Sequence, residues 1–160
     1  MSSTGRDEAA VHCALVTAPI DTAALLATVR SDASGAVSIF AGTVRNHHRG
    51  AAVDSLEYEA YGSMAEQEMR RIAAEACGRW ELHGVAIVHR TGHLEVGEVS
   101  VAVAVSAAHR KESVEACAWT IDMVKERLPI WKREKGEAGI RWVLGDDSPG
   151  SAAGWLERRK

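Results

Sequence analysis

The sequence has few cysteines and no pattern that would let them hold a metal ion or a disulfide framework. Its three cysteines, Cys13, Cys77 and Cys117, are far apart, odd in number and outside any C-x-x-C motif. No cluster of cysteines and histidines has the spacing of a zinc site. We therefore expect reduced, buried thiols in a cytoplasmic protein, with no metal and no bound cofactor.

Long apolar segments are also missing. The uncharged stretch 33–44 has about half of the ~20 residues that a membrane-spanning helix requires. Near the beginning, Arg6, Asp7 and Glu8 precede a stretch broken by His12 and Pro19, which is not the pattern of a signal peptide. We expect no membrane association and a cytoplasmic location.

An excess of positive charge is absent as well. The 160 residues include 19 Lys and Arg against 22 Asp and Glu, which gives a formal net charge of −3. An acidic protein gains nothing from a nucleic acid or an anionic membrane as partner, so both are excluded as expected ligands. One segment differs, because residues 125–135 hold five basic residues against two acidic ones. This segment indicates a local anion site, although a solvated basic face has the same composition.

The pattern of apolar residues predicts a single domain over 11–144, with a disordered leader at 1–10 and a mobile tail at 145–160. Strands are expected over 11–17, 36–44, 53–60, 85–89, 99–105 and 140–144, and helices over 21–30, 64–80 and 108–128. The stretches 45–50 and 92–97 are expected to be loops. Short, mostly antiparallel strands with two long helices indicate an α+β fold, not a doubly wound sheet.

The helix expected over 108–128 carries the sharpest functional signal. With Ile121 as reference and about 100° per residue, the residues within about 60° form its expected buried stripe, namely Val114, Cys117, Ala118, Val124 and Leu128. Lys125 lies about 40° from Ile121, inside this stripe. An ammonium group there must reach water along its stem, find a partner or line a pocket.

A second lysine follows soon after this helix. Pro129 ends the helix, and a turn into Trp131 and Lys132 can bring Lys132 back toward Lys125. Two neighbouring ammonium groups repel each other, and partial burial adds to the effect, so either amine would lose its proton more readily. A neutral amine can act as nucleophile or base, whereas a charged one stabilises an oxyanion or a phosphate. The sequence leaves these roles open.

Three more side chains can hold an anion. Arg45 ends an expected strand, and His109 and Arg110 start the second long helix, where the helix N-terminus itself favours phosphate. Arg110 and Lys125 are 15 residues apart, which is about 22 Å along an unbroken helix. They cannot both contact one small substrate within one subunit. Either Arg110 is structural, or it reaches the site of a neighbouring subunit, which implies a dimer with composite active sites.

The other histidines are weaker candidates. His47 and His48 are expected to be solvated loop residues. His89 and His93 are four residues apart, but on a strand and a turn, so the helical spacing of a metal-binding pair does not apply.

Several ordered motifs together resemble the large, catalytic subunit of molybdopterin synthase. The resemblance covers about residues 11–143. It rests on Phe40-Ala41-Gly42-Thr43-Val44-Arg45-Asn46-His47, Leu56-Glu57-Tyr58-Glu59-Ala60-Tyr61 with Met64-Ala65, His89-Arg90-Thr91-Gly92, Ser106-Ala107-Ala108-His109-Arg110, and Lys125 through Pro129-Ile130-Trp131-Lys132-Arg133-Glu134.

This resemblance implies an α/β hammerhead fold and a homodimer in which each copy binds one ubiquitin-like small subunit, giving a heterotetramer. The small subunit would carry a C-terminal thiocarboxylate and deliver sulfur to cyclic pyranopterin monophosphate, so that two transfers form the dithiolene of molybdopterin. Carried over to this chain, the resemblance implies Lys125 and Lys132 as catalytic residues. It implies substrate-binding roles for Thr43, Val44, Arg45, His109, Arg110, Arg133 and Glu134.

Two other interpretations remain. The basic residues can form a non-catalytic module that holds a phosphorylated ligand or an acidic peptide tail. Alternatively, Trp119 and Met123, on the helix face opposite Ile121, can form a contact surface of a structural partner protein, with the lysines merely reaching water.

Overall fold

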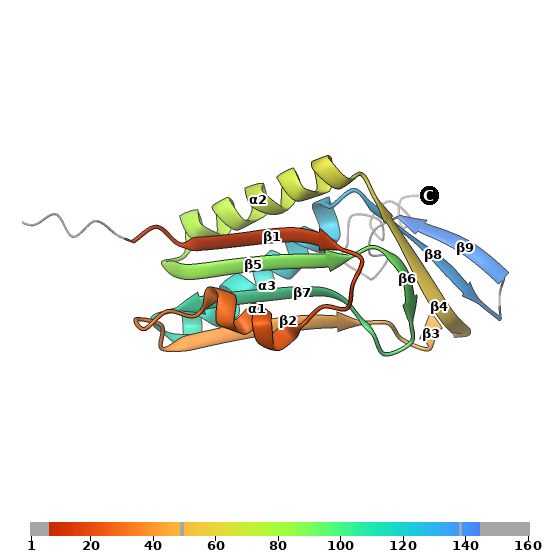
Figure 1. Ribbon diagram of the computed structural model, residues 1–160, viewed down its shortest axis with the longest axis horizontal. Coiled ribbons are helices and arrows are strands. Elements are labelled where there is room, and N and C mark those ends of the chain that lie inside the picture. Colours follow the sequence, from red (N-terminus) through yellow and green to blue (C-terminus); the bar gives the residue numbers. More distant parts are fainter. Residues whose placement is uncertain (1–6, 49, 138, 145–160) are drawn as a thin grey trace, which may run out of the picture.

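The computed structural model describes residues 7–48, 50–137 and 139–144 (Figure 1). Residues 1–6 of the expected leader and the whole expected tail lie outside the described residues. The elements in chain order are β1 (Ala10–Val16), α1 (Thr22–Val29), β2 (Ala36–Thr43), β3 (His47–His48), β4 (Ala51–Ala60), α2 (Gly62–Arg79), β5 (Leu82–Arg90), β6 (Gly92–Glu95), β7 (Val99–Ala107), α3 (Arg110–Arg127), β8 (Ile130–Gly136) and β9 (Gly139–Leu144).

A four-stranded sheet with the order β1-β5-β7-β2 forms the larger part of the molecule. Its β1–β5 pair is parallel, and the pairs β5–β7 and β7–β2 are antiparallel. Alternate residues of the central strands face opposite sides of the sheet. Val85 and Ile87 belong to the core cluster beneath α2 and α3, whereas Ala86 and Val88 pack with Leu25 of α1. Figure 1 accordingly shows α1 on one face of this sheet and the two long helices on the other.

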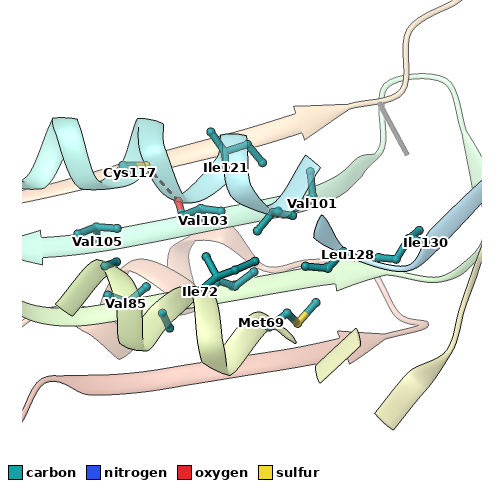
Figure 2. Packing of buried hydrophobic residues seen from close by; sticks show 14 of the residues in the cluster. Met69, Ile72, Val85, Val101, Val103, Val105, Cys117, Ile121, Leu128 and Ile130 are labelled. Carbon is teal, nitrogen blue, oxygen red and sulfur yellow. Dashed lines mark hydrogen bonds between the residues drawn. The ribbon is translucent and has the colours of Figure 1, made fainter. Parts of the chain in front are cut away.

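The helices begin and end where the sequence provides signals. The Asp21 side chain caps α1 by accepting a hydrogen bond from the Ala24 N–H at 3.0 Å. Met69 and Ile72 of α2, at helical spacing, are fully buried against the sheet (Figure 2). Pro129 follows the C-cap of α3, where it cannot continue the helix. The expected α+β class, with mostly antiparallel strands and two long helices, is confirmed.

A second sheet lies at one end of the molecule and has the order β3-β4-β8-β9, with β6 also paired to β4. Three of its strands were not expected. The expected loop 45–50 contains β3, the expected connection 92–97 contains β6, and β8 follows Pro129 where only a turn was foreseen. These segments are polar or short, so their apolar periodicity is weak. Pairing with β4 determines their structure instead.

The buried side of α3 also differs from the expected stripe. Its buried residues are Ser113, Ala116, Cys117, Thr120, Ile121 and Val124, whereas Val114 is 58% exposed and Ala118 is exposed. The buried side is rotated because α3 packs on both the sheet and α2. Ser113 fits there because its hydroxyl donates to the Val105 carbonyl at 2.9 Å. Lys125 therefore lies at the edge of the buried side, not within it.

Trp119 and Met123, which were expected to form a contact surface for another protein, pack against residues of this chain. Both side chains are partly buried against the main core. The Trp119 ring lies 5.7 Å from that of Trp80, and the Arg79 guanidinium stands 4.8 Å from the centroid of Trp119. These contacts link Trp119 to the end of α2 within this chain.

Candidate active site

The fold brings Lys125 and Lys132 together. Lys125 lies in the last turn of α3, and Lys132 lies on β8, directly after the proline-ended helix. Both line a narrow pocket of about 30 Å³, formed by Tyr58, His89, Val124, Lys125, Leu128, Ile130 and Lys132. Both also line a wide cleft of about 120 Å³, formed by Gly42, Thr43, Arg45, His47, His48, Val53, Leu56, Tyr58, Ser100, Lys125, Lys132 and Glu134. The expected approach of the two lysines is confirmed.

Strand β8 determines which of its charged side chains reach the site. Lys132 and Glu134 alternate with Arg133, so the two lie on one face of the strand and Arg133 on the other. In the β4–β8 pairing, Arg133 stands opposite Glu57 and forms an ion pair with it. Glu134 is 6% exposed and lines the cleft. Of the two predicted substrate residues on β8, the structure places Glu134 in the site and Arg133 outside its lining.

Glu134 connects Lys132 with a histidine that sequence reasoning assigned to a solvated loop. Glu134 Oε1 lies 3.6 Å from Lys132 Nζ and 3.3 Å from His48 Nδ1. The side chains of His48 and Glu134 are each 7% exposed, and that of Lys132 is 17% exposed. His48 is buried because β3 pairs with β4, which lies beside β8. The expectation of a solvated His48 is wrong, whereas its neighbour His47 is exposed.

His89 is a second buried histidine that the sequence did not single out for the site. Its Nδ1–H donates to the Arg90 carbonyl at 2.7 Å, and its ring meets Tyr58 edge-on, 5.1 Å between centroids. Burial, followed by the charge of Lys125, lowers the pKa of His89 to about 4. The imidazole is therefore neutral at neutral pH, with an unprotonated Nε2. It lines the narrow pocket beside both lysines.

Residues at and after the end of β2 also line the wide cleft. Thr43 and Arg45 both line it. Val44 between them is 3% exposed and belongs to the main core. Its N–H donates to the Glu98 carbonyl at 3.0 Å, which fixes this segment after the β-bulge at Gly42. Val44, a predicted substrate residue, therefore holds its two neighbours in place without lining the cleft.

His109 and Arg110 lie at the opposite end of α3 from Lys125. His109 is the N-cap residue and Arg110 the first residue of this unbroken helix. Both are exposed, and His109 lines a different cleft, of about 420 Å³, with Arg79, Trp80, Glu81, Ala108, Lys111, Glu112 and Glu115. At about 1.5 Å per residue, the helix keeps Arg110 about 22 Å from Lys125. The structure thus does not bring His109 and Arg110 into the lysine site of their own subunit.

The wide cleft is positively charged. Arg45, Lys125 and Lys132 contribute three cationic groups against the single carboxylate of Glu134. Such a cleft attracts an anion, and amines that face it can stabilise developing negative charge. Among the described residues, no group of three or more His, Cys, Asp or Glu side chains could hold a metal ion. Within the same residues, no helix is long and apolar enough to cross a bilayer.

Comparison with known proteins identifies relatives over most of the chain. Residues 15–127 match the family model described as MoaE protein. The chain is 49% identical over 121 residues to the molybdopterin synthase catalytic subunit of Pyrococcus abyssi, which covers 76% of this chain and 82% of that protein. It is 42% identical over 125 residues to the Bacillus subtilis protein of the same name, which covers 78% and 80%. The match to the human protein of this name has 46% identity and covers 71% of this chain and 61% of the human one.

Solved structures agree with the sequence matches. Molybdopterin synthase from Staphylococcus aureus superposes with a TM-score of 0.78 at 37% identity, covering 81% of this chain and 95% of that one. A Helicobacter pylori complex of subunits 1 and 2 of molybdopterin-converting factor shares the fold with a TM-score of 0.67 at 20% identity, covering 87% and 92%. The family match covers well over half of the sequence and includes Thr43, Arg45 and Lys125 of the cleft. The chain therefore belongs to the MoaE family.

Proposed function

We propose that this chain is the large, catalytic subunit of a molybdopterin synthase. It transfers sulfur from the C-terminal thiocarboxylate of a ubiquitin-like small subunit to cyclic pyranopterin monophosphate, and two transfers form the dithiolene of molybdopterin. The observation that carries the proposal is that Lys125 and Lys132 line both the narrow pocket and the wide cleft. The names of the relatives support it. The cytoplasmic location expected from the sequence stays a prediction.

The two cavities suit the two reactants. The wide cleft, with Arg45 and the two lysines, suits the phosphate of the pyranopterin. The narrow pocket has apolar walls from Val124, Leu128 and Ile130. An extended chain end without bulky side chains could enter such a space, and the terminal thiocarboxylate of the small subunit would meet the lysines. The two amines would then stand between the sulfur donor and its acceptor.

The lysines have two chemical tasks in this proposal. As ammonium groups they neutralise the thiocarboxylate and the phosphate, which allows the two anions to approach each other. In each transfer the sulfur forms a bond to a pyranopterin carbon and an oxygen leaves that carbon. The carbon–sulfur bond of the thiocarboxylate breaks, and the acyl carbon bonds to water, either directly or after a neutral lysine amine has attacked it. Either route returns the small subunit with an ordinary carboxylate.

We further propose that the enzyme contains two copies of this chain, each with one small subunit. His109 and Arg110 lie too far along α3 to serve their own site, so they would serve the site of the partner copy. Strand β2 is an edge of the four-stranded sheet and exposes apolar side chains, with Ile39 at 38% and Phe40 at 37%. An open, apolar strand edge supports self-association. Sedimentation of the purified chain should give about twice its 17.2 kDa, and a strict monomer that is active with its partner contradicts the composite site.

The proposal is tested by product formation from the pyranopterin and a thiocarboxylated ubiquitin-like protein. Lys125→Ala should lower turnover far more than it weakens the binding of either reactant. Lys125→Arg should not recover full turnover, because a guanidinium keeps the charge but cannot act as a neutral amine. Lys135→Ala is the matched control, since Lys135 is an exposed lysine of β8. Unchanged turnover in the Lys125 variants would favour a non-catalytic module for a phosphorylated ligand or an acidic peptide.

A further inference from the structure

A buried histidine lies beside Lys132 in the wide cleft. His48 is 6% exposed, and its Nδ1 contacts Glu134 Oε1 at 3.3 Å. The same oxygen is the one that faces Lys132 Nζ, at 3.6 Å. One carboxylate oxygen is therefore shared between a histidine of β3 and a lysine of β8. All three side chains line the wide cleft.

The ammonium group of Lys132 and the carboxylate of Glu134 are not in close contact. Charge-assisted N–H···O contacts usually close to about 2.7–2.9 Å, and burial strengthens the attraction between an ammonium and a carboxylate. The Lys132–Glu134 distance of 3.6 Å is longer, although both side chains are largely buried, and the His48–Glu134 distance of 3.3 Å is the shorter of the two. A ring nitrogen that faces a carboxylate is attracted to it when it carries a proton. His48 thus competes with Lys132 for the same oxygen.

We propose that His48 is a positioning residue for Lys132. By holding Glu134 Oε1, it keeps the carboxylate from closing on the lysine, so that the Lys132 amine remains available in the wide cleft. His48 also lies three residues after Arg45, so the segment that carries the cleft's arginine is connected to β8 through this contact. For the reaction itself, this inference rests on the proposed function, whereas the competition for Glu134 does not.

A second histidine–glutamate pair in the same chain serves as a control. His93 Nε2 lies 2.7 Å from Glu95 Oε1, but these side chains are 58% and 67% exposed. Both pairs join an imidazole nitrogen to a carboxylate, through Nδ1 in His48 and Nε2 in His93, and their surroundings differ. The exposed pair lies on β6 and lines neither the narrow pocket nor the wide cleft.

The test measures how fast each lysine is acetylated by limiting acetic anhydride, using peptide mass spectrometry of the full chain. Exposed Lys135 on the same strand is the internal reference. In His48→Leu, acetylation of Lys132 should slow by about tenfold, the lower end expected when an amine gains a hydrogen bond to a charged group. His48→Asn should react within about twofold of wild type, because the Asn amide nitrogen takes roughly the place of Nδ1. His93→Leu should leave Lys132 unchanged.

Glu134→Gln tests separately whether Glu134 acts on the Lys132 amine, which the inference requires. It removes the carboxylate that attracts the Lys132 amine, so this amine should be acetylated faster than in wild type. The inference is overturned if Lys132 reacts at the wild-type rate or faster in folded His48→Leu, if His48→Asn is as slow as His48→Leu, or if Glu134→Gln has no effect.

Turnover gives the functional side of the test. In the complete complex, His48→Leu should lower kcat more than it raises the KM for the pyranopterin, and His48→Asn should restore kcat. A merely structural role would instead lower activity in parallel with the melting temperature in both variants. If the wild-type complex forms no product, the proposed function fails, and the acetylation rates still decide whether His48 positions Lys132.

Discussion

Replacing Lys125 and Lys132 separately by methionine should give two enzymes that are equally impaired but unequally stable. Methionine keeps most of the apolar stem, so the change removes mainly the amine. If each amine acts on the transition state, each variant should lose about 10²–10³ in kcat, the usual effect of deleting one stabilising donor. Turnover alone therefore cannot distinguish the two lysines.

Stability should distinguish them because their surroundings differ. Lys125 is half-buried in the last turn of α3, where a cation adds about 0.3–1 kcal/mol through the helix dipole. Lys132 faces the buried carboxylate of Glu134. Removing one partner of a buried pair costs about 3–5 kcal/mol. Since His48 still contacts Glu134, we expect about 2 kcal/mol, which lowers the melting temperature by about 4–8 °C for a domain of this size.

The measurement is a urea and thermal unfolding series beside turnover, with a third variant that combines Lys132→Met and Glu134→Gln. This double variant no longer buries a carboxylate that has lost its lysine, so it should recover most of the lost stability and none of the activity. Equal unfolding free energies for Lys125→Met and Lys132→Met would refute the reasoning about Glu134. Wild-type turnover in both single variants would refute the proposed site.

Three further predictions concern the folded state. Burial lowers the pKa of His89 from 6.5 to about 4, so between these pH values the unfolded chain binds a proton that the folded chain does not. The free energy of unfolding should therefore fall on acidification from pH 6.5 to 4, by up to about 3 kcal/mol. Urea unfolding at several pH values should show that this free energy depends less on pH in His89→Gln than in wild type. The same pH dependence in both proteins would contradict the prediction. Gly84→Ala should cost about 2 kcal/mol, because the new Cβ would stand 2.7 Å from the Val29 carbonyl oxygen of α1. Gly78→Ala should instead stabilise α2 by about 0.5–1 kcal/mol, because Gly78 has open space around it; a loss of stability there would contradict the space argument.

The parts of the fold with strong apolar periodicity were predictable from the sequence. Strand β7 was expected because Val99, Val101, Val103 and Val105 alternate with smaller residues, and the structure buries the last three of them in the sheet. The approach of Lys125 and Lys132 was foreseen because only seven positions and a proline separate them. The helical spacing also showed that Arg110 belongs to a different end of the molecule.

The parts that escaped prediction depend on contacts distant in the sequence. Strand β8 has polar residues on both of its faces, so its sequence lacks the apolar alternation of a half-buried strand. It forms a strand because it pairs with β4 and β9. The burial of His48 requires both the β3–β4 pairing and the approach of Glu134, 86 positions later. His89 is preceded by apolar residues that predict a strand, but nothing local indicates that its ring meets Tyr58. Side-chain partners of this kind follow from topology and not from local spacing.

The length of α3 has a consequence for how such a sequence can change. The helix is one continuous rod of 18 residues, with Arg110 at its first position and Lys125 in its last turn. One inserted residue between them would turn one end by about 100° relative to the other and shift it by about 1.5 Å. That rotation would carry either Lys125 out of both cavities or the residues beneath the sheet out of the core. Substitutions along the exposed side of the rod are tolerable, but insertions and deletions within it are not.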